Sequence, residues 1–384
     1  MAELKVLLTG GGTGGHIFPL IAVAQELKKQ SGQLGIPLDM RYFGSAREYA
    51  QEIVDNGIEF VPVISSKLRR YWSPSNLIDI PKFILSLAQL LWKVFWFMPD
   101  VIFSKGGPGA LAAVLIGKFY FIPVVIHESD SIPGLTNAIS GFLAKKIFLA
   151  FSSAADHFKN KDIEIVGNPV RGSLMAQTEP LGGENEKDQI LKSFGFNPDE
   201  KTILILGGSQ GAEKLNNFVM EGLEPLLQQF QILHQTGTQN YDDYKKEYDF
   251  LTKDWGDLEK NRYHFRAFFD KDLADALIVS DLVLARAGSG TIFELAAFGK
   301  ASILVPLPNS AGDHQKENAR IYSESGAAIV IHEENLLTNL IIDEVKKILQ
   351  NKELLQKMEA AARSFYRPDS AALIARHLLT YLNV

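Results

Sequence analysis

The 384-residue sequence contains no cysteine, which excludes disulfides, thiol nucleophiles and cysteine-ligated zinc. It also lacks an excess of positive charge, because 45 acidic residues outnumber 39 basic ones and the formal net charge is −6. Nucleic-acid-binding domains are usually basic. We therefore expect no nucleic-acid partner.

Long apolar runs are absent as well. No stretch reaches the roughly eighteen uninterrupted apolar residues that a membrane-spanning helix needs. Residues Met1–Leu8 lead straight into a strand pattern, without the charged start, apolar core and small-residue cleavage site of a signal peptide. We also find no cluster with metal-ligand spacing. These absences predict a cytoplasmic protein that needs no metal or other cofactor.

What is present is an alternation of short apolar segments with helical patterns, which predicts parallel α/β sheets. The length suits two domains of roughly 150–200 residues each. The expected strands are Lys5–Leu8, Val101–Phe103, Pro123–His127, Thr202–Leu206, Leu282–Ala285 and Ser302–Pro306.

Two stretches of the chain echo each other. DVIFSKGGPGALAAVLIGK, from Asp100, and DLVLARAGSGTIFELAAFGK, from Asp281, both give an aspartate, a strand, a basic residue, a glycine turn, a helix and Gly-Lys. The basic residues are Lys105 and Arg286. Each half also opens with a strand and a glycine-rich turn, LLTGGGTGGH or LILGGSQGAEKL. We predict two Rossmann-like domains in tandem, with a boundary near Ile165–Gly172.

The first glycine-rich turn satisfies the dinucleotide pattern G-x-G-x-x-G with Gly10, Gly12 and Gly15. A dehydrogenase also needs an acidic residue at the end of the second strand. Here that strand, LDMRYFGSA, ends in Gly44–Ala46. A dehydrogenase is therefore disfavoured, and two interpretations remain: a tight packing turn, or backbone N–H groups that face a polar ligand.

The second domain carries a better phosphate cradle, GGSQGA at Gly207–Ala212. Its glycines permit close approach of the backbone, and the next helix points its positive end at the loop. It lacks the Lys-Ser/Thr of a P-loop. Glu294 lies one turn into the helix after AGSG, where a carboxylate could accept both hydroxyls of a ribose. The loop VPLPNSAGDHQKENA could read sugar hydroxyls.

Several motifs together resemble one family. GGTGGHIFP, GGPGA, HES–SIPGLTN, VGNPVR, GGSQGA, AGSGTIFE and DHQKENA occur in the order found in the MurG family, glycosyltransferase family 28. The resemblance covers nearly the whole chain and implies the GT-B fold, two Rossmann-like domains with parallel sheets facing a central cleft. It implies an acceptor and membrane-binding domain at 1–168, a UDP-GlcNAc-binding domain at 169–367, and a last helix, within 368–384, that packs back on the first.

The resemblance also implies an activity. Members transfer N-acetylglucosamine (GlcNAc) from UDP-GlcNAc to the C4 hydroxyl of the N-acetylmuramic acid (MurNAc) of lipid-linked muramoyl-pentapeptide, the step from lipid I to lipid II in peptidoglycan synthesis. They invert the anomeric centre and act as peripheral enzymes on the cytoplasmic face of the cell membrane. A single displacement of this kind needs a general base and a site that stabilises the leaving diphosphate.

Substrate-binding positions carry over by motif. In the second domain, Arg171 and Ser209 would contact the diphosphate, the Phe269 backbone would read uracil, Glu294 would bind ribose and Gln315 would bind GlcNAc. The full set is Thr13, Gly14, Gly15, Asp130, Asn137, Arg171, Ser209, Gln210, Phe269, Ser289, Gly290, Thr291, Ile292, Phe293, Glu294 and Gln315.

Two residues compete for the role of base. His16 directly follows the first glycine turn and has an ordinary pKa near neutrality. Glu128 ends the strand PVVIH. One departure from the family falls beside it: the family often has His-Glu-Gln-Asn where this chain has His127–Asp130. An aspartate accepts hydrogen bonds but cannot donate them when ionised, so a sugar contact at Asp130 is weakened.

The most apolar stretch is Ser75–Pro99, preceded by the basic and aromatic Lys67–Pro74. One interpretation is an ordinary core helix. The other is an interfacial patch in which Trp92, Phe95 and Trp96 enter the headgroup region of an anionic membrane. We favour a helix that is partly core and partly membrane-facing.

Other functions stay open at this point. A GT-B enzyme with a different lipid or small acceptor would keep the same donor motifs. A UDP-GlcNAc 2-epimerase shares the two-domain layout, and a non-catalytic nucleotide-binding module is a third class. His16, Glu128, Glu294 and Gln315 together disfavour the last.

Overall fold

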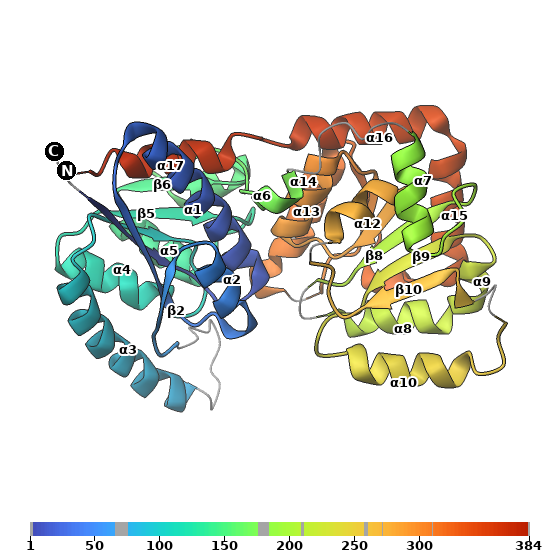
Figure 1. Cartoon of the computed structure of the whole chain (residues 1–384), viewed down its shortest axis with the longest axis horizontal. Helices are drawn as coiled ribbons and strands as arrows, with labels where there is room; N and C mark the ends of the chain where they lie inside the picture. The colour runs from blue at the N-terminus through green and yellow to red at the C-terminus, as the bar shows by residue number, and fades with distance from the viewer. Residues whose placement is uncertain are drawn as a thin grey trace. The chain divides into compact units, whose positions relative to one another are not determined.

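The computed structural model describes residues 3–65, 76–175, 184–208, 211–256, 260–270, 272–308 and 310–382, without the side chains of 47, 76–78, 184–185 and 311. The chain forms two compact α/β units (Figure 1). Unit 1 comprises Met1–Gly172 and Arg367–Val384, and unit 2 comprises Ser173–Tyr366.

Unit 1 is built on a seven-stranded sheet with the order β3-β2-β1-β4-β5-β6-β7, and every strand pair in it is parallel. Its strands are β1 (Leu4–Thr9), β2 (Leu38–Gly44), β3 (Glu59–Pro62), β4 (Val101–Ser104), β5 (Val124–Glu128), β6 (Lys146–Leu149) and β7 (Ile163–Ile165). Its helices are α1 (Gly14–Leu34), η1 (Arg47–Tyr49), α2 (Ala50–Asp55), α3 (Asn76–Phe97), α4 (Ala110–Phe119), α5 (Leu135–Leu143), η2 (Ser152–His157) and α17 (Ser370–Leu379).

Side chains along β1 alternate between the two faces of this sheet. Val6 and Leu8 pack against α1 and α17, where Ile374 and Leu378 are fully buried. Leu7 faces the other way, into a cluster with Val94 of α3 and residues of α4. Side chains on a strand alternate between faces, so one strand can serve two helical layers. Figure 1 shows α17 beside α1, far from it in sequence.

Unit 2 has a six-stranded parallel sheet with the order β10-β9-β8-β11-β12-β13. Its strands are β8 (Thr202–Leu206), β9 (Gln231–Gln235), β10 (Tyr263–Arg266), β11 (Leu282–Ala285), β12 (Ser302–Leu304) and β13 (Ala328–Val330). Its helices are α7 (Glu184–Ser193), α8 (Glu213–Glu221), α9 (Leu223–Leu227), α10 (Tyr241–Leu251), α12 (Leu273–Val279), α13 (Ser289–Phe298), η3 (Ala311–Asp313), α14 (His314–Glu324), η4 (Glu333–Asn335), α15 (Thr338–Gln350) and α16 (Lys352–Phe365), with α6 (Gly172–Met175) at the junction.

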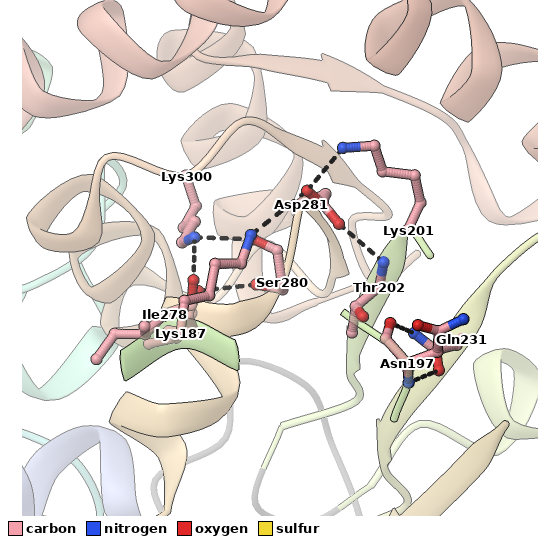
Figure 2. A network of polar contacts seen from close by, with 10 residues as sticks. Lys187, Asn197, Lys201, Thr202, Gln231, Ile278, Ser280, Asp281 and Lys300 are labelled. Atoms are coloured by element: carbon pink, nitrogen blue, oxygen red, sulfur yellow. Dashed lines mark hydrogen bonds and ion pairs between the residues drawn. The ribbon is translucent and has the colours of Figure 1, made fainter. Parts of the chain in front are cut away.

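The prediction of two α/β domains with parallel sheets is confirmed, and all six expected strands are present to within two residues. The sequence echo is also structural. The Asp100 carboxylate accepts a hydrogen bond from the Lys5 amide at the start of β1 (2.8 Å), and Asp281 accepts one from the Thr202 amide at the start of β8 (2.9 Å). Figure 2 shows the second contact, with Lys201 also on Asp281.

Candidate functional site

Each unit has one topological switch point, where the strand order reverses. It lies between β1 and β4 in unit 1 and between β8 and β11 in unit 2. Thr9 pairs with Ser104, and Leu206 pairs with Ala285, so each switch point has two strand ends at one level. All four glycine-rich turns follow these strand ends. Ligands of open α/β sheets bind at such positions.

His16 stands in the first turn of α1, directly after the first glycine-rich turn. Thr13 is the N-cap residue, but its hydroxyl makes no cap bond to the helix backbone. Thr13 Oγ1 instead lies 2.9 Å from His16 Nδ1. When Nδ1 carries the proton and donates to Thr13, the Nε2 lone pair is available, as a general base requires.

Two glycines make room for this imidazole. A Cβ added at Gly11 would lie 2.9 Å from His16 Nδ1, and one added at Gly107 would lie 2.8 Å from His16 Nε2. Gly107 also has a φ of +84°, which L side chains rarely adopt. The glycines at these positions therefore pack the catalytic candidate between the two turns of the switch point.

The surroundings keep His16 uncharged. Burial and, to a smaller extent, the Lys105 charge lower the pKa of His16 to about 4, although the Asp130 charge offsets part of the shift. A neutral imidazole at pH 7 can accept a proton. His16 is partly buried, whereas the other candidate, Glu128, is only 3% exposed.

Glu128 organises the loop that follows β5. Its Oε1 accepts from the Asp130 amide (2.9 Å), and its Oε2 accepts from the Gly134 amide (3.2 Å) and Asn137 Nδ2 (3.0 Å). Burial raises the pKa of Glu128, with the Asp130 charge adding to the shift. These three hydrogen bonds from backbone and side-chain donors let Glu128 hold the loop after β5 in place. The roles of His16 and Glu128 as base stay predictions.

The remaining predicted residues of unit 1 have different settings. Asn137 is buried and also donates to the His127 carbonyl (3.1 Å), whereas Asp130 and Gly15 are accessible to solvent. The Arg171 guanidinium lies 4.0 Å from the centre of the Phe18 ring, within unit 1. Their substrate contacts stay predictions.

In unit 2, the predicted nucleotide segment forms the start of α13. The side chains of Ile292 and Phe293 belong to the core, so their contacts with a nucleotide would use backbone atoms. Glu294 is partly exposed on the first turns of the same helix. Asn318 Nδ2 of α14 donates to the Ala287 carbonyl and ties α14 to the glycine turn. Ser289, Gly290 and Thr291 complete the segment.

Two further positions of unit 2 already have local partners. The Phe269 amide donates to Gln235 Oε1 (3.0 Å), and Gln315 Oε1 accepts from the Leu307 amide (3.0 Å). Ser209 and Gln210 lie outside the described residues. The donor-binding roles of these four residues stay predictions.

Helix α3 combines a core face with an exposed apolar face. Leu90, Val94 and Phe97 are buried, whereas Trp92 and Trp96 are 66% and 68% exposed. The window Asp79–Phe97 reaches the length and mean hydropathy (1.3) of a candidate membrane span, with 22% of it buried. A single helix of this kind is weak evidence for a membrane span, because only its length and composition meet the criteria for one.

The sequence did not single out Lys105 as a functional residue, although the echo placed a basic residue there. Lys105 is 2% exposed and lies directly behind the Gly106–Gly107 turn. In the described part of the chain, no group of three or more histidine, aspartate or glutamate residues could hold a metal ion.

The class of protein follows from comparison with known families. Residues 6–149 match the glycosyltransferase family 28 N-terminal domain, and residues 202–374 match the glycosyltransferase family 28 C-terminal domain. The chain belongs to glycosyltransferase family 28.

Curated relatives are similar over almost their whole length. A UDP-N-acetylglucosamine–N-acetylmuramyl-(pentapeptide) pyrophosphoryl-undecaprenol N-acetylglucosamine transferase of Bacillus cereus is 33% identical over 97% of this chain and 99% of its own. The enzyme with the same name from Legionella pneumophila is 33% identical over 91% of this chain and 90% of its own.

Solved structures agree on the fold. The crystal structure of Acinetobacter baumannii MurG matches with a TM-score of 0.68 and 25% identity, over 98% of this chain and 100% of that one. A UDP-GlcNAc 2-epimerase from Neisseria meningitidis, bound to UDP-GlcNAc, has the same TM-score of 0.68 at 17% identity, over 98% and 100% of the two chains. At that identity the likeness concerns the fold alone.

Proposed function

We propose that this chain is an inverting N-acetylglucosaminyltransferase that moves GlcNAc from UDP-GlcNAc to the MurNAc C4 hydroxyl of lipid-linked muramoyl-pentapeptide. The observation that carries the proposal is the 33% identity to an enzyme of that name across 97% of the chain. The partly buried position of His16 and the buried position of Glu128 in unit 1, and the place of Glu294 at the start of α13 in unit 2, agree with the proposal.

Each switch point serves one substrate of the reaction. Unit 1 takes the acceptor, and His16, oriented by Thr13, removes the proton as the hydroxyl oxygen attacks the anomeric carbon. Unit 2 takes the donor, where the turn at Gly207–Ala212 and the start of α13 stabilise the charge that develops on the leaving UDP.

The first test is transfer of radiolabelled GlcNAc to lipid-linked muramoyl-pentapeptide, with EDTA present and His16→Ala alongside. We expect transfer by the wild-type protein, insensitive to the chelator, and loss of transfer in the variant. Donor binding without transfer would point to another acceptor. Conversion of UDP-GlcNAc to its C2 epimer, free or still linked to UDP, without any acceptor would favour a non-hydrolysing 2-epimerase instead.

We further propose peripheral binding at the cytoplasmic face of an anionic membrane through α3. Trp92, Phe95 and Trp96 are exposed, and the Trp96 ring meets each of the other two rings edge to face. The Phe95 ring contacts Tyr120, whose ring contacts Phe119. Phe121 is exposed and lies beside a hollow lined in part by lysines. Aromatic rings with lysines nearby suit the headgroup region. The lysines are Lys118, Lys145 and Lys161.

Vesicle sedimentation tests this surface. The triple variant Trp92→Ser, Phe95→Ser, Trp96→Ser should lose binding to phosphatidylglycerol vesicles while it keeps the wild-type affinity for UDP. A matched control removes the exposed apolar pair of α10, Phe250 and Leu251, which are 74% and 45% exposed in unit 2. Equal vesicle binding by the triple variant and the wild type would refute the membrane role of α3.

A further inference from the structure

Lys105 is a buried ammonium group at the switch point of unit 1. It follows β4, its amide donates to the Thr9 carbonyl (3.0 Å), and its side chain is 2% exposed. Isolated buried charges are costly, so a lysine in this position needs hydrogen-bond partners. The mechanism proposed above does not use it.

The ammonium meets three acceptors. Lys105 Nζ lies 2.6 Å from His127 Nδ1 and 3.0 Å from Asn168 Oδ1, and it donates to Ser129 Oγ. An ammonium has three N–H donors and no acceptor. His127 Nε2 lies 2.8 Å from the Gly167 carbonyl, to which it must donate, so its Nδ1 is the acceptor for Lys105. Every N–H of the charged form is thereby matched.

These partners come from separate segments of unit 1. His127 and Ser129 flank Glu128 at the end of β5, whereas Asn168 lies in the segment that follows β7. Gly167, beside it, also accepts from Ser370 Oγ of α17 (3.1 Å). Lys105 therefore joins the glycine turn that packs on His16 to the strand end that carries Glu128.

Four titratable groups face the ammonium: His16 of α1, His127 and Glu128 of β5, and Asp130 of the following loop. Burial is the main cause of the lowered pKa of His16 and of His127, and the Lys105 charge adds to both shifts. The same charge opposes the rise in the pKa of Glu128 that burial causes. Burial lowers the pKa of Lys105, while Glu128 and Asp130 raise it.

We propose that Lys105 is a positioning residue of the acceptor site: its ammonium clamps the Gly106–Gly107 turn, which packs on His16, to the end of β5 that carries Glu128, and it places a positive charge beside both groups. This inference rests on the proposed function, because it assigns Lys105 to the acceptor half of that reaction. Lys105 acts through His16 and touches no substrate.

The direct test follows the His16 side chain by NMR, in protein labelled with ¹³C-histidine and assigned with His16→Ala. Lys105→Met removes the charge and keeps the length of the side chain. We expect its His16 pKa to rise by about one unit. Lys146→Met is the matched control, since Lys146 is paired with Asp162 and Glu164, and it should leave the His16 pKa unchanged. An unchanged His16 pKa in folded Lys105→Met would overturn the proposal.

A kinetic test uses the pH profile of kcat/KM for the acceptor. The acidic limb should move up by about one pH unit in Lys105→Met and stay in place in Lys105→Arg, which keeps the charge. Lower activity with an unmoved limb would mean a purely structural role and would refute the proposal. Absence of transfer by the wild type would instead refute the proposed function, and the NMR result would still stand or fall by itself.

If Lys105→Met fails to fold, Asn168→Asp provides a nearly isosteric alternative. It keeps the ammonium but places a carboxylate on it, so the His16 pKa and the acidic limb should both move upward. A folded Asn168→Asp protein with the wild-type His16 pKa would count against the proposal.

Discussion

The switch points of the two units share a backbone plan and differ in what surrounds it. In unit 1, the glycine turn packs on His16, and the basic residue behind it, Lys105, bonds to groups of the site itself. In unit 2, the equivalent Arg286 donates to the Val305 carbonyl and to Glu333 Oε2.

The glycines of the turns also differ between the units in how much space surrounds them. A side chain at Gly107 would strike His16, whereas Cβ atoms at Gly288 and Gly290 would meet nothing within 4 Å. The switch point of unit 1 is crowded with titratable groups, whereas the start of α13 in unit 2 leaves space at Gly288 and Gly290. Under the proposed function, the first would serve proton transfer and the second the binding of an anionic nucleotide.

The largest expected effect is that of His16→Ala on turnover. Loss of a general base should lower kcat by about 10²–10⁴-fold. The KM for UDP-GlcNAc should change by less than about threefold, because the donor belongs to unit 2 and a group that acts in the transition state contributes little to ground-state binding. Steady-state kinetics with both substrates varied would check this. A rise in the KM for UDP-GlcNAc that accounts for the whole loss of kcat/KM would contradict the assignment of the donor to unit 2 and the acceptor to unit 1.

A pair of glycine substitutions tests the crowding directly. Gly107→Ala should destabilise the protein by about 2–4 kcal/mol, because the φ of +84° is strained for alanine and the Cβ meets Gly11 at 2.9 Å. Gly290→Ala, in open space inside α13, should be neutral or stabilising by up to about 1 kcal/mol. Urea unfolding of both variants measures this, and equal losses would show that the two turns are equally tight.

Much of this architecture is predictable from the sequence, because strands buried on both faces read as short apolar runs and the echo marks the repeated βα unit. Asp100 and Asp281 hold equivalent places for that reason. The roles of Lys105 and Glu128 are not predictable in this way. Their hydrogen-bond partners include residues such as Asn168 and Gly134, which only the folded loops bring close. For α3, by contrast, the prediction of a partly buried helix with Trp92, Phe95 and Trp96 on its outer side agrees with the exposure of these residues.

Acid sensitivity offers a further comparison, because unit 2 also buries a histidine. His234 is 0% exposed, its Nδ1 lies 2.7 Å from the Tyr263 hydroxyl, and burial lowers its pKa to about 3. Between about pH 6.5 and this value the unfolded chain binds a proton that the folded chain excludes. Stability is therefore fully present above pH 6.5 and falls with acid, by about 2 kcal/mol between pH 7 and pH 5 for this group.

His234→Asn should remove that part of the pH dependence, although it lowers stability at pH 7 by leaving space in the core. Denaturant unfolding from pH 5 to pH 7 measures the slope. An unaltered slope in the variant would mean that His234 does not contribute, and that the acid sensitivity resides with His16 and His127 in unit 1.

The smallest effect concerns Glu294, the carboxylate assigned to the donor. Glu294→Gln keeps the shape of the side chain but loses its charge, and charge-assisted hydrogen bonds are roughly twice as strong as neutral ones. We expect UDP affinity to fall about tenfold, which corresponds to about 1.4 kcal/mol, with kcat reduced far less. Glu317→Gln is the matched control, because Glu317 is paired with Arg320 on α14. Calorimetric titration with UDP alone isolates unit 2 from the acceptor. Unchanged affinity in Glu294→Gln would place the ribose elsewhere and leave the open start of α13 without its assigned ligand.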